Sequence, residues 1–197
     1  EPIALALSLK SGKPVKLVMT RDEVFKATGP TVSSSMDVKI GMTKDGNITA
    51  GEAHLRYQGG AFPNGTVEMG AQSAFAAYDL KAVRTKGWNV LTNRPKQAAY
   101  RAPGAPQAIY AVESVVDELC QKLNLDPLEI RIKNAAKKGT KSSYGPTFDD
   151  IGLIATLEAA KKHPHYLAPL EENQGRGLSC GFWFNFGGDT CVTLNVN

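Results

Sequence analysis

Residues 99–123 read AYRAPGAPQAIYAVESVVDELCQKL and join a stiff loop to the strongest helical pattern of the chain. Pro106 suits the first turn of a helix, where a missing N–H costs nothing. The charged side chains of this stretch, Glu113 among them, lie largely off the apolar stripe. The stripe itself has a spacing of three or four positions and consists of Ile109, Val112, Val116, Leu119 and Leu123. The pattern predicts an amphipathic helix that begins near Pro106 and packs on a core.

Alternating apolar and polar residues earlier in the chain predict a β-hairpin. Residues 36–42 alternate strictly, an Asp-Gly pair at 45–46 marks the turn, and 48–57 form the return strand. Further strands are expected from β-branched and apolar runs at 15–19, 82–91, 178–186 and 190–197, the last two around Gly187-Gly188.

Helices are expected on both sides of the hairpin. Thr20 with Glu23 has the form of a capping box, Thr66 is a candidate cap, and 163–165 read as a helix exit. The expected ranges are 2–11, 20–28, 66–76, 127–134 and 150–162. Helices and strands mix without strict alternation, so the sequence predicts an α+β fold of mixed helices and sheets rather than a doubly wound sheet.

Composition excludes several classes of protein. The chain has 197 residues, 42% hydrophobic and 21% charged, with a net charge of +4, as in an ordinary soluble globular protein. It has no basic run that indicates nucleic-acid binding and no apolar stretch that would span a membrane. The three cysteines lack C-x-x-C spacing, which predicts reduced thiols in a cytoplasmic protein and no zinc or iron–sulfur site within this chain.

The loop before the long helix contains the best candidate for a binding residue. Arg101 lies among small residues, which let a ligand approach the backbone closely. Its guanidinium is a permanently charged, planar donor, and the N–H groups of Ala105, Gln107 and Ala108 at the helix N-terminus favour an anion. The alternative is that Arg101 pairs with a surface carboxylate. Without further information, these residues indicate only an α+β domain.

Several motifs in order resemble the xanthine dehydrogenase/aldehyde oxidase family of molybdenum hydroxylases, in their large molybdopterin-binding subunit. Residues 99–108, followed by Glu113, resemble the family's aromatic-Arg-Gly/Ala-x-Gly-x-Pro-Gln motif. The other matching segments are 12–23, 44–50, 126–134 and 175–178. Each motif alone is weak, but the ordered set covers nearly the whole chain.

The resemblance implies a molybdenum–molybdopterin cofactor whose metal is held by the pterin dithiolene and by non-protein ligands. Arg101 would be catalytic beside the metal without binding it directly, and Ala102 and Gly104 would complete the cofactor-binding loop. The family adds oxygen from water to an electron-poor carbon and passes electrons to iron–sulfur (2Fe-2S) and FAD partner domains or subunits. The cytosine dinucleotide form of the pterin is expected.

The substrate pocket implied by the resemblance contains Pro103, Glu68, Met69, Phe184 and Phe186. Pro103 stands where relatives place an aromatic side chain, and Glu68-Met69 stand where purine-oxidising members carry an Arg, so an aldehyde or N-heteroaromatic substrate is favoured over xanthine. Ala102 stands where carbon monoxide dehydrogenases have a Cys, which argues against CO oxidation. Core packing is the alternative role for the aromatic run at 182–186.

Both ends of the sequence read as cut, so the expected organisation is a first part of the cofactor-binding domain at 1–175 and the start of a following β segment at 176–197. The family's catalytic Glu and its glycine-rich cofactor loop are not found in this stretch. The piece alone is therefore expected to be inactive and to bind no molybdenum. A degenerate, non-catalytic domain used in assembly or binding is the main alternative, and a hydrolase or binding protein of unrelated fold is the third.

Overall fold

A three-stranded mixed sheet is the centre of the molecule in the computed structural model, which describes residues 1–197 except 30, 64, 185–190, 192 and 194–197. The strands are β1 (Ser34–Met42), β2 (Ile48–Gly60) and β3 (Val83–Leu91), in the order β1-β2-β3. β1 and β2 are antiparallel, whereas β2 and β3 are parallel. The strand expected at 82–91 and the hairpin are thus confirmed.

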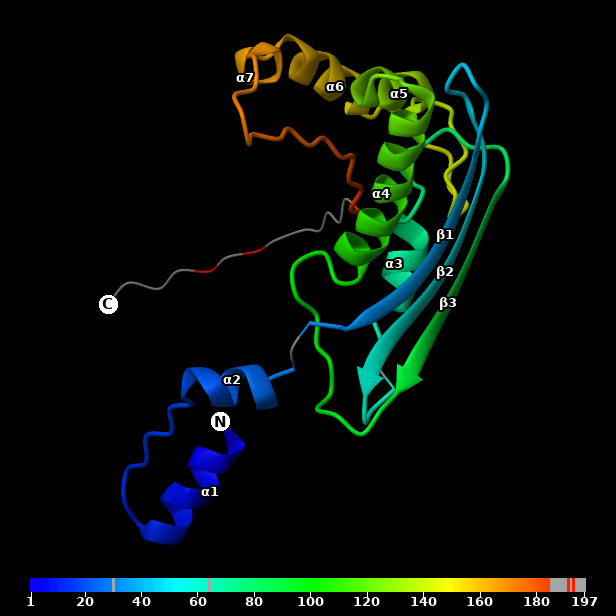
Figure 1. Ribbon diagram of the computed structural model, residues 1–197. Helices are drawn as coiled ribbons and strands as arrows, with labels where there is room; N and C mark the ends of the chain where they lie inside the picture. Colours follow the sequence, from blue (N-terminus) through cyan, green and yellow to red (C-terminus); the bar gives the residue numbers. More distant parts are fainter. Residues whose placement is uncertain (30, 64, 185–190, 192, 194–197) are drawn as a thin grey trace.

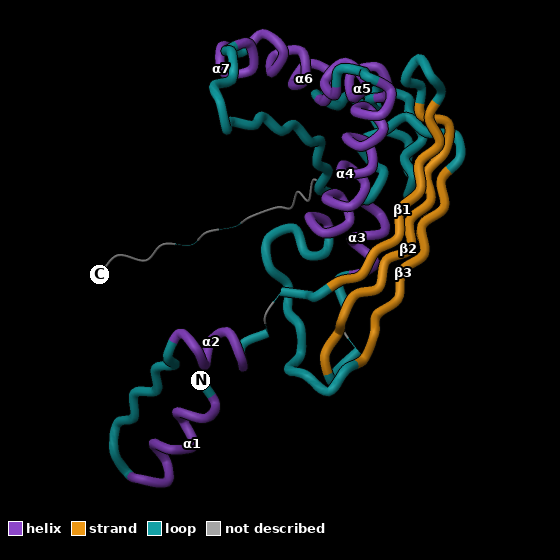
Figure 2. Tube along the Cα trace, in the orientation of Figure 1, coloured by secondary structure: helices purple, strands orange, loops and turns teal. Residues whose placement is uncertain are grey.

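Helices cover one face of this sheet and one of its ends. Figures 1 and 2 show α4 lying along the sheet, with α3 beside it and α5 to α7 gathered at one end, while α1 and α2 stand apart from the sheet. The bounds are α1 (Pro2–Ser11), α2 (Arg21–Ala27), α3 (Val67–Ser73), α4 (Ala105–Leu123), α5 (Pro127–Asn134), α6 (Leu153–Lys162) and α7 (Pro164–Leu167). This mixture confirms the α+β class.

The core lies between the sheet and α4. In the hairpin, Met36 pairs with Leu55 and Val38 with Ala53, so the apolar side chains of both strands point to the same face. Val112 and Val116 of α4 are fully buried in the same cluster. The apolar side chains at every second position of the strands therefore pack against those at every third or fourth position of α4, as the sequence predicts.

Local capping explains where several helices begin. Thr20 caps α2 in a complete capping box with Glu23, as expected. The Asp126 carboxylate caps α5 by accepting from the N–H groups of Leu128 and Glu129 at 2.8 and 2.9 Å.

Asn134 ties the turn of the hairpin to α5. Its side chain accepts from Ile48 N–H at 2.8 Å and donates to the carbonyls of Gly46 and Ile130, each at 2.8 Å. Because Asn134 is only 7% exposed, these three backbone groups have little access to water as a substitute partner.

We expect Asn134→Ala to lower the free energy of unfolding by about 2–3 kcal/mol, since it leaves buried backbone groups unpaired. Asn47→Ala is the matched control, because the exposed Asn47 side chain bonds, among the described residues, only Asp45 two positions before it. Urea denaturation of both variants measures the difference, and equal losses of stability would contradict the role assigned to Asn134.

Other expectations about secondary structure were wrong. Residues 15–19 form no strand, and Val18 is 72% exposed. β-Branched residues favour an extended backbone, but a strand also needs a neighbour to receive its hydrogen bonds, and the described sheet does not include this segment.

The expected strand at 178–186 is likewise absent over its described residues, 178–184. Phe186, Gly187 and Gly188 lie outside the described residues, as does most of 190–197. Thr66 precedes α3 but its side chain makes no capping hydrogen bond, and α3 ends at Ser73 rather than near 76. The helix exit expected at 163–165 is confirmed, since α6 ends at Lys162 with His163 as its C-cap; His163 also begins α7, because its Nδ1 accepts from His165 N–H at 3.2 Å.

Candidate functional site

The loop that leads into α4 bends sharply just after Arg101. Ala102 has φ +54° and Gly104 has φ +86°, so two of its residues adopt the left-handed conformation. The Tyr57 hydroxyl of β2 donates to the Gly104 carbonyl at 2.7 Å. This hydrogen bond ties the turn to strand β2 of the sheet.

Gly104 also lies against the start of α3. A Cβ at this position would lie 2.1 Å from the Thr66 carbonyl oxygen, which is a backbone atom that cannot swing away. The positive φ and the close approach both require glycine here. The geometry of the Arg101 loop thus depends on one residue without a side chain.

Arg101 is exposed, and its guanidinium has no hydrogen bond or ion pair with the described part of the chain. It lines a cavity of about 840 Å³ beside the first turn of α4. The other lining residues are Thr31, Ser34, Met36, Tyr100, Ala102, Pro106, Gln107 and Tyr110. Pairing with a surface carboxylate, the alternative raised by the sequence, is not observed among the described residues.

A second cavity, of about 720 Å³, lies between α4 and the segment 177–183. It shares Ala102, Pro106 and Tyr110 with the first cavity. The loop and the first turns of α4 therefore separate two hollows, and Arg101 lines only one of them.

Two of the three N–H groups expected to favour an anion are already used. Ala105 N–H donates to the Ala102 carbonyl at 3.1 Å, and Ala108 N–H donates to the Gly104 carbonyl at 3.5 Å. Among the described residues, Gln107 N–H has no acceptor. The expected set of donors is thus reduced to Arg101 and one N–H group, because the tight turn satisfies the others.

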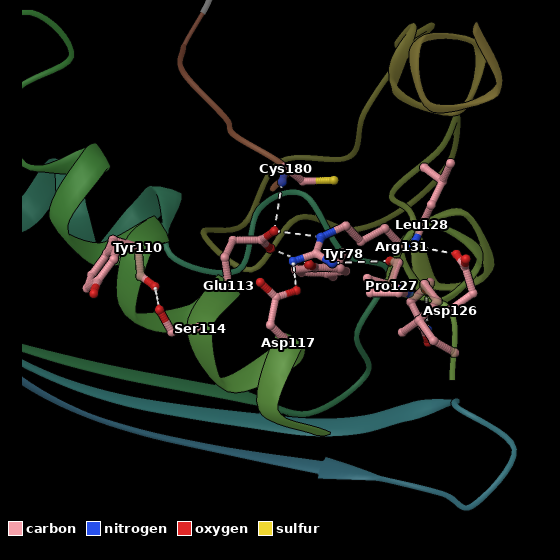
Figure 3. Close-up of polar contacts among 12 residues, drawn as sticks. Tyr78, Tyr110, Glu113, Ser114, Asp117, Asp126, Pro127, Leu128, Arg131 and Cys180 are labelled. Carbon is pink, nitrogen blue, oxygen red and sulfur yellow. Dashed lines mark hydrogen bonds and ion pairs between the residues drawn. The ribbon is translucent and has the colours of Figure 1, made fainter. Parts of the chain in front are cut away.

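A buried polar network lies farther along α4 (Figure 3). The Glu113 carboxylate accepts from Arg131 Nε at 2.8 Å and from Cys180 N–H at 2.7 Å, both on Oε2, and from the Tyr78 hydroxyl on Oε1. Arg131 also binds Asp117 Oδ1 at 2.8 Å. Glu113 is 4% exposed and Arg131 is fully buried, so both charges depend on these partners.

The sequence analysis missed this network and was wrong in placing Glu113 off the apolar stripe. Glu113 lies four positions after Ile109 and three before Val116, so it shares their face of the helix. A carboxylate at a position with apolar neighbours three and four residues away was the available signal. Its partners on α5 and at Cys180 could not be read from that spacing.

Burial shifts the proton equilibria of several groups around the network. Burial, and then the nearby Glu113 charge, raise the pKa of Cys180 to about 11. Burial followed by the charge of Glu113 raises the pKa of Tyr78 well above its ordinary value, and burial raises the pKa of Cys120. These groups therefore stay protonated in the folded protein at pH values where unfolded thiols begin to ionise.

We expect stability to fall as the pH rises from about 9 to about 11, because the unfolded chain releases these protons first. An acid whose pKa is higher in the folded than in the unfolded state stabilises the fold at pH values below its unfolded pKa. This stabilisation is lost as the pH rises from the unfolded pKa to the folded pKa. Melting temperatures between pH 7 and 11 test the effect, and Cys180→Ala should flatten the upper part of the profile. An unchanged slope in Cys180→Ala would contradict the assignment to this thiol.

The remaining described residues of the expected substrate pocket do not line the cavity beside Arg101. Pro103 is half-buried and lines neither cavity, and Glu68 and Met69 lie on α3 without lining them. Phe184 packs on Tyr144 and on its neighbour Phe182, with ring centroids 5.3 and 5.2 Å apart. Their roles stay predictions, as does that of Phe186 outside the described residues.

Phe182 and Trp183, by contrast, do line the 720 Å³ cavity. The aromatic run therefore reaches the second cavity through these two residues, whereas neither of them lines the cavity beside Arg101. Its other described member, Phe184, belongs to an aromatic cluster with Tyr144.

Three further features bear on metals, thiols and membranes. The described residues contain no group of three or more His, Cys, Asp or Glu side chains placed to hold a metal ion. All three cysteines are free, with Cys120 and Cys180 buried and Cys191 exposed. None of the helices in the described part of the chain combines the length and apolar content that crossing a bilayer requires.

Residues 1–135 match the family model described as the molybdopterin cofactor-binding domain. The chain belongs to this family. The Arg101 loop and α4 lie inside the matched range, and the 177–183 segment lies beyond it. The resemblance to the xanthine dehydrogenase/aldehyde oxidase family is confirmed.

Curated relatives of this cofactor-binding domain are much longer proteins. An aldehyde oxidoreductase of Megalodesulfovibrio gigas is 31% identical over 93% of this chain and 21% of its own length. A nicotinate dehydrogenase large molybdopterin subunit of Eubacterium barkeri is 32% identical over 79% of this chain and 38% of its own length. The chain thus spans between about a fifth and two fifths of these relatives.

Solved structures agree with the cofactor-binding domain fold. Aldehyde oxidoreductase from Desulfovibrio gigas superimposes with a TM-score of 0.76 at 30% identity, covering 85% of this chain and 18% of that one. Carbon monoxide dehydrogenase from Oligotropha carboxidovorans gives 0.63 at 26% identity, covering 84% and 22%. The architecture seen here is therefore that of a segment of the molybdenum hydroxylases.

Proposed function

We propose that this chain forms part of an enzyme that hydroxylates an aldehyde or N-heteroaromatic compound at a molybdopterin centre, with Arg101 in direct contact with cofactor or substrate. The observation that carries the proposal is the unpaired Arg101 guanidinium on a rigid turn beside a cavity of about 840 Å³. An arginine with a structural role normally pairs with a carboxylate or a carbonyl, as Arg131 does in this chain.

The residues around this cavity fit a cofactor rich in oxygen and nitrogen. Arg101 supplies donors, and the buried Gln107 Oε1 has no hydrogen-bond partner among the described residues and so offers an acceptor. Gly104 and Ala102 hold the loop close to the start of α4, where a larger residue at 104 would collide with α3. We assign cofactor binding to Arg101, Ala102 and Gly104, with no direct metal ligand.

When bound, the molybdenum–molybdopterin group supplies the oxidising centre and the activated oxygen derived from water. The part of this chain is to bind and orient. A fixed guanidinium stabilises negative charge where it develops, and it would do so best once a bound cofactor and substrate displace water from the cavity. The half-buried Ala102 leaves room next to that charge.

The proposed substrate class has support in the names of the relatives, which include an aldehyde oxidoreductase and a nicotinate dehydrogenase. Ala102 provides no thiol beside Arg101, which argues against carbon monoxide as substrate even though a carbon monoxide dehydrogenase shares the fold. Pro103, Glu68, Met69, Phe184 and Phe186 remain the proposed pocket residues.

Electron transfer completes the proposal. The two electrons released by hydroxylation leave through 2Fe-2S and FAD partner domains or subunits, because this chain has no cysteine set for a cluster among its described residues. The cytosine dinucleotide form of the pterin and a cytoplasmic location are part of the same proposal.

The test uses the complete protein with its partners. Purified protein should contain molybdenum and oxidise members of a panel of aldehydes and N-heteroaromatic compounds. Arg101→Ala should lower kcat/KM by about 100-fold, the usual effect of losing one preorganised donor, with stability unchanged within about 0.5 kcal/mol.

Arg94→Ala is the matched control, since Arg94 is an exposed arginine of the same connection between β3 and α4 and lines neither cavity. It should retain the activity of the parent protein. Full turnover in Arg101→Ala would remove the role of Arg101, and a protein without molybdenum or turnover would favour the non-catalytic alternative.

A further inference from the structure

We propose that Glu113 is a positioning residue, whose carboxylate holds the segment 177–183 against α4 and thereby sets the width of the 720 Å³ cavity beside the Arg101 loop. This cavity has two walls. One is the first half of α4, and the other is the segment 177–183, which includes Phe182 and Trp183. Glu113 lies where the two walls meet.

The segment is held to α4 mainly at one point. Residues 177–182 form no strand with any described part of the chain, so no ladder of backbone hydrogen bonds holds them. Between residues 177 and 182, the N–H of Cys180 is the one backbone group that hydrogen-bonds within the described part of the chain, and its acceptor is Glu113 Oε2 at 2.7 Å. A charge-assisted bond of this length in a buried place is a strong restraint.

Apolar contacts support the same attachment. Cys180 is 5% exposed and belongs to the main core cluster, and Leu178 packs against that cluster. Alternate residues of the segment therefore point inward, while the side chains between them are exposed to solvent or to the cavity. The hydrogen bond from Cys180 N–H fixes which residues point inward, because a shift of the segment by one residue along α4 would turn the Phe182 side chain to the opposite side.

The Glu113 side chain is itself immobile. Arg131 binds the same oxygen as Cys180, and the Tyr78 hydroxyl bonds the other oxygen. Both oxygens of a carboxylate accept hydrogen bonds, so the Glu113 side chain satisfies these three donors at once. The NH2 group of a Gln side chain would instead face one of these donors with a donor of its own. The chemistry of the site thus calls for Glu rather than Gln.

Stability alone does not explain a buried ion pair at this place. Replacing both members of such a pair with apolar residues of similar volume is often neutral or stabilising. The feature that apolar residues cannot reproduce here is an acceptor for the Cys180 N–H. We therefore assign the Glu113 charge to the placement of the cavity wall.

The test compares three variants of the complete protein with the parent by hydrogen exchange. In the first variant, Glu113→Leu is combined with Arg131→Met, which keeps the interior apolar and leaves no unpaired buried charge. The peptide covering 177–183 should exchange about 10- to 100-fold faster than in the parent, relative to a β2 peptide that reports global opening. Glu113→Gln is the second variant, used should the double variant not fold, and it should show the same effect more weakly.

Tyr78→Phe is the matched control, because it removes the hydrogen bond to the other oxygen of the same carboxylate and lines neither cavity. In this control, the 177–183 and β2 peptides should change together. Equal relative exchange of 177–183 in the Glu113 variants and in Tyr78→Phe would overturn the proposal.

A kinetic measurement separates positioning from general loosening and rests on the proposed function. The Glu113 variants should raise KM about ten-fold with kcat within about three-fold of the parent, since they disturb the wall of the cavity that shares Ala102 and Pro106 with the Arg101 cavity and leave Arg101 in place. An unchanged KM together with faster exchange would refute the link to the cavity. The exchange result needs no substrate, so an inactive parent protein would count against the proposed function and leave the assignment of Glu113 to be decided by exchange.

Discussion

Replacing Arg131 with methionine is expected to lower the free energy of unfolding by about 3–5 kcal/mol. The Arg131 side chain is fully buried and binds Glu113 and Asp117, each at 2.8 Å, and the Pro127 carbonyl at 3.1 Å. Its loss leaves the Glu113 carboxylate buried without a counter-charge. Burial by itself opposes the charged guanidinium, but the charge of Glu113, the nearby Tyr78 and the hydrogen bonds to Glu113 and Asp117 together raise the pKa of Arg131, so its guanidinium stays charged at all ordinary pH values.

The measurement is guanidinium or urea denaturation followed by circular dichroism. Arg56→Met is the control, because Arg56 forms a comparable ion pair with Asp37 at 2.7 Å but on the exposed face of the sheet. It should change stability by no more than about 1 kcal/mol. A loss in Arg131→Met no larger than in Arg56→Met would mean that the buried network contributes little.

Gly104→Ala is expected to destabilise the protein by about 2–4 kcal/mol and to displace the Arg101 loop. Its φ of +86° disfavours any residue with a Cβ, and the added methyl would lie 2.1 Å from the Thr66 carbonyl oxygen. The turn can relieve this contact only by moving away from α3, which also breaks the hydrogen bond from Tyr57. The complete protein should therefore lose both stability and turnover.

The control variant Gly139→Ala separates the cost of the positive φ from the cost of the close approach to α3. Gly139 has φ +85°, almost the same as Gly104, but a Cβ there would meet nothing within 4 Å. This control should cost only the backbone strain, about 1 kcal/mol. If both variants lost the same stability in thermal denaturation, close approach to α3 would not be the reason for glycine at 104.

Sequence patterns were reliable where neighbours along the chain decide the structure. The hairpin from Ser34 to Gly60 follows from strict alternation and an Asp-Gly turn, and α4 from its apolar spacing and Pro106. The capping box at Thr20 and the cap at Asp126 were likewise readable, because a cap involves residues two or three positions apart.

The secondary-structure predictions were wrong where a partner distant in sequence decides the local structure. Residues 15–19 have strand propensity but no neighbouring strand among the described residues, so they remain irregular. Residues 178–184 pack on α4 through Cys180 and do not form a sheet. β-Propensity describes how a side chain suits a pleated surface and does not supply the surface.

In the candidate site, too, some features follow from neighbours along the chain and others from residues distant in sequence. The order of motifs in the sequence determined the family and singled out Arg101 and its turn, because the glycine and proline spacing of that loop is a local property. Only the tertiary structure decided that Arg101 is unpaired, that Gly104 touches α3, and that Glu113 is buried against a residue 67 positions away. The physical reason is that a desolvated charge is stabilised by whatever donors the fold brings to it, and these come from segments whose approach depends on the packing of the whole core.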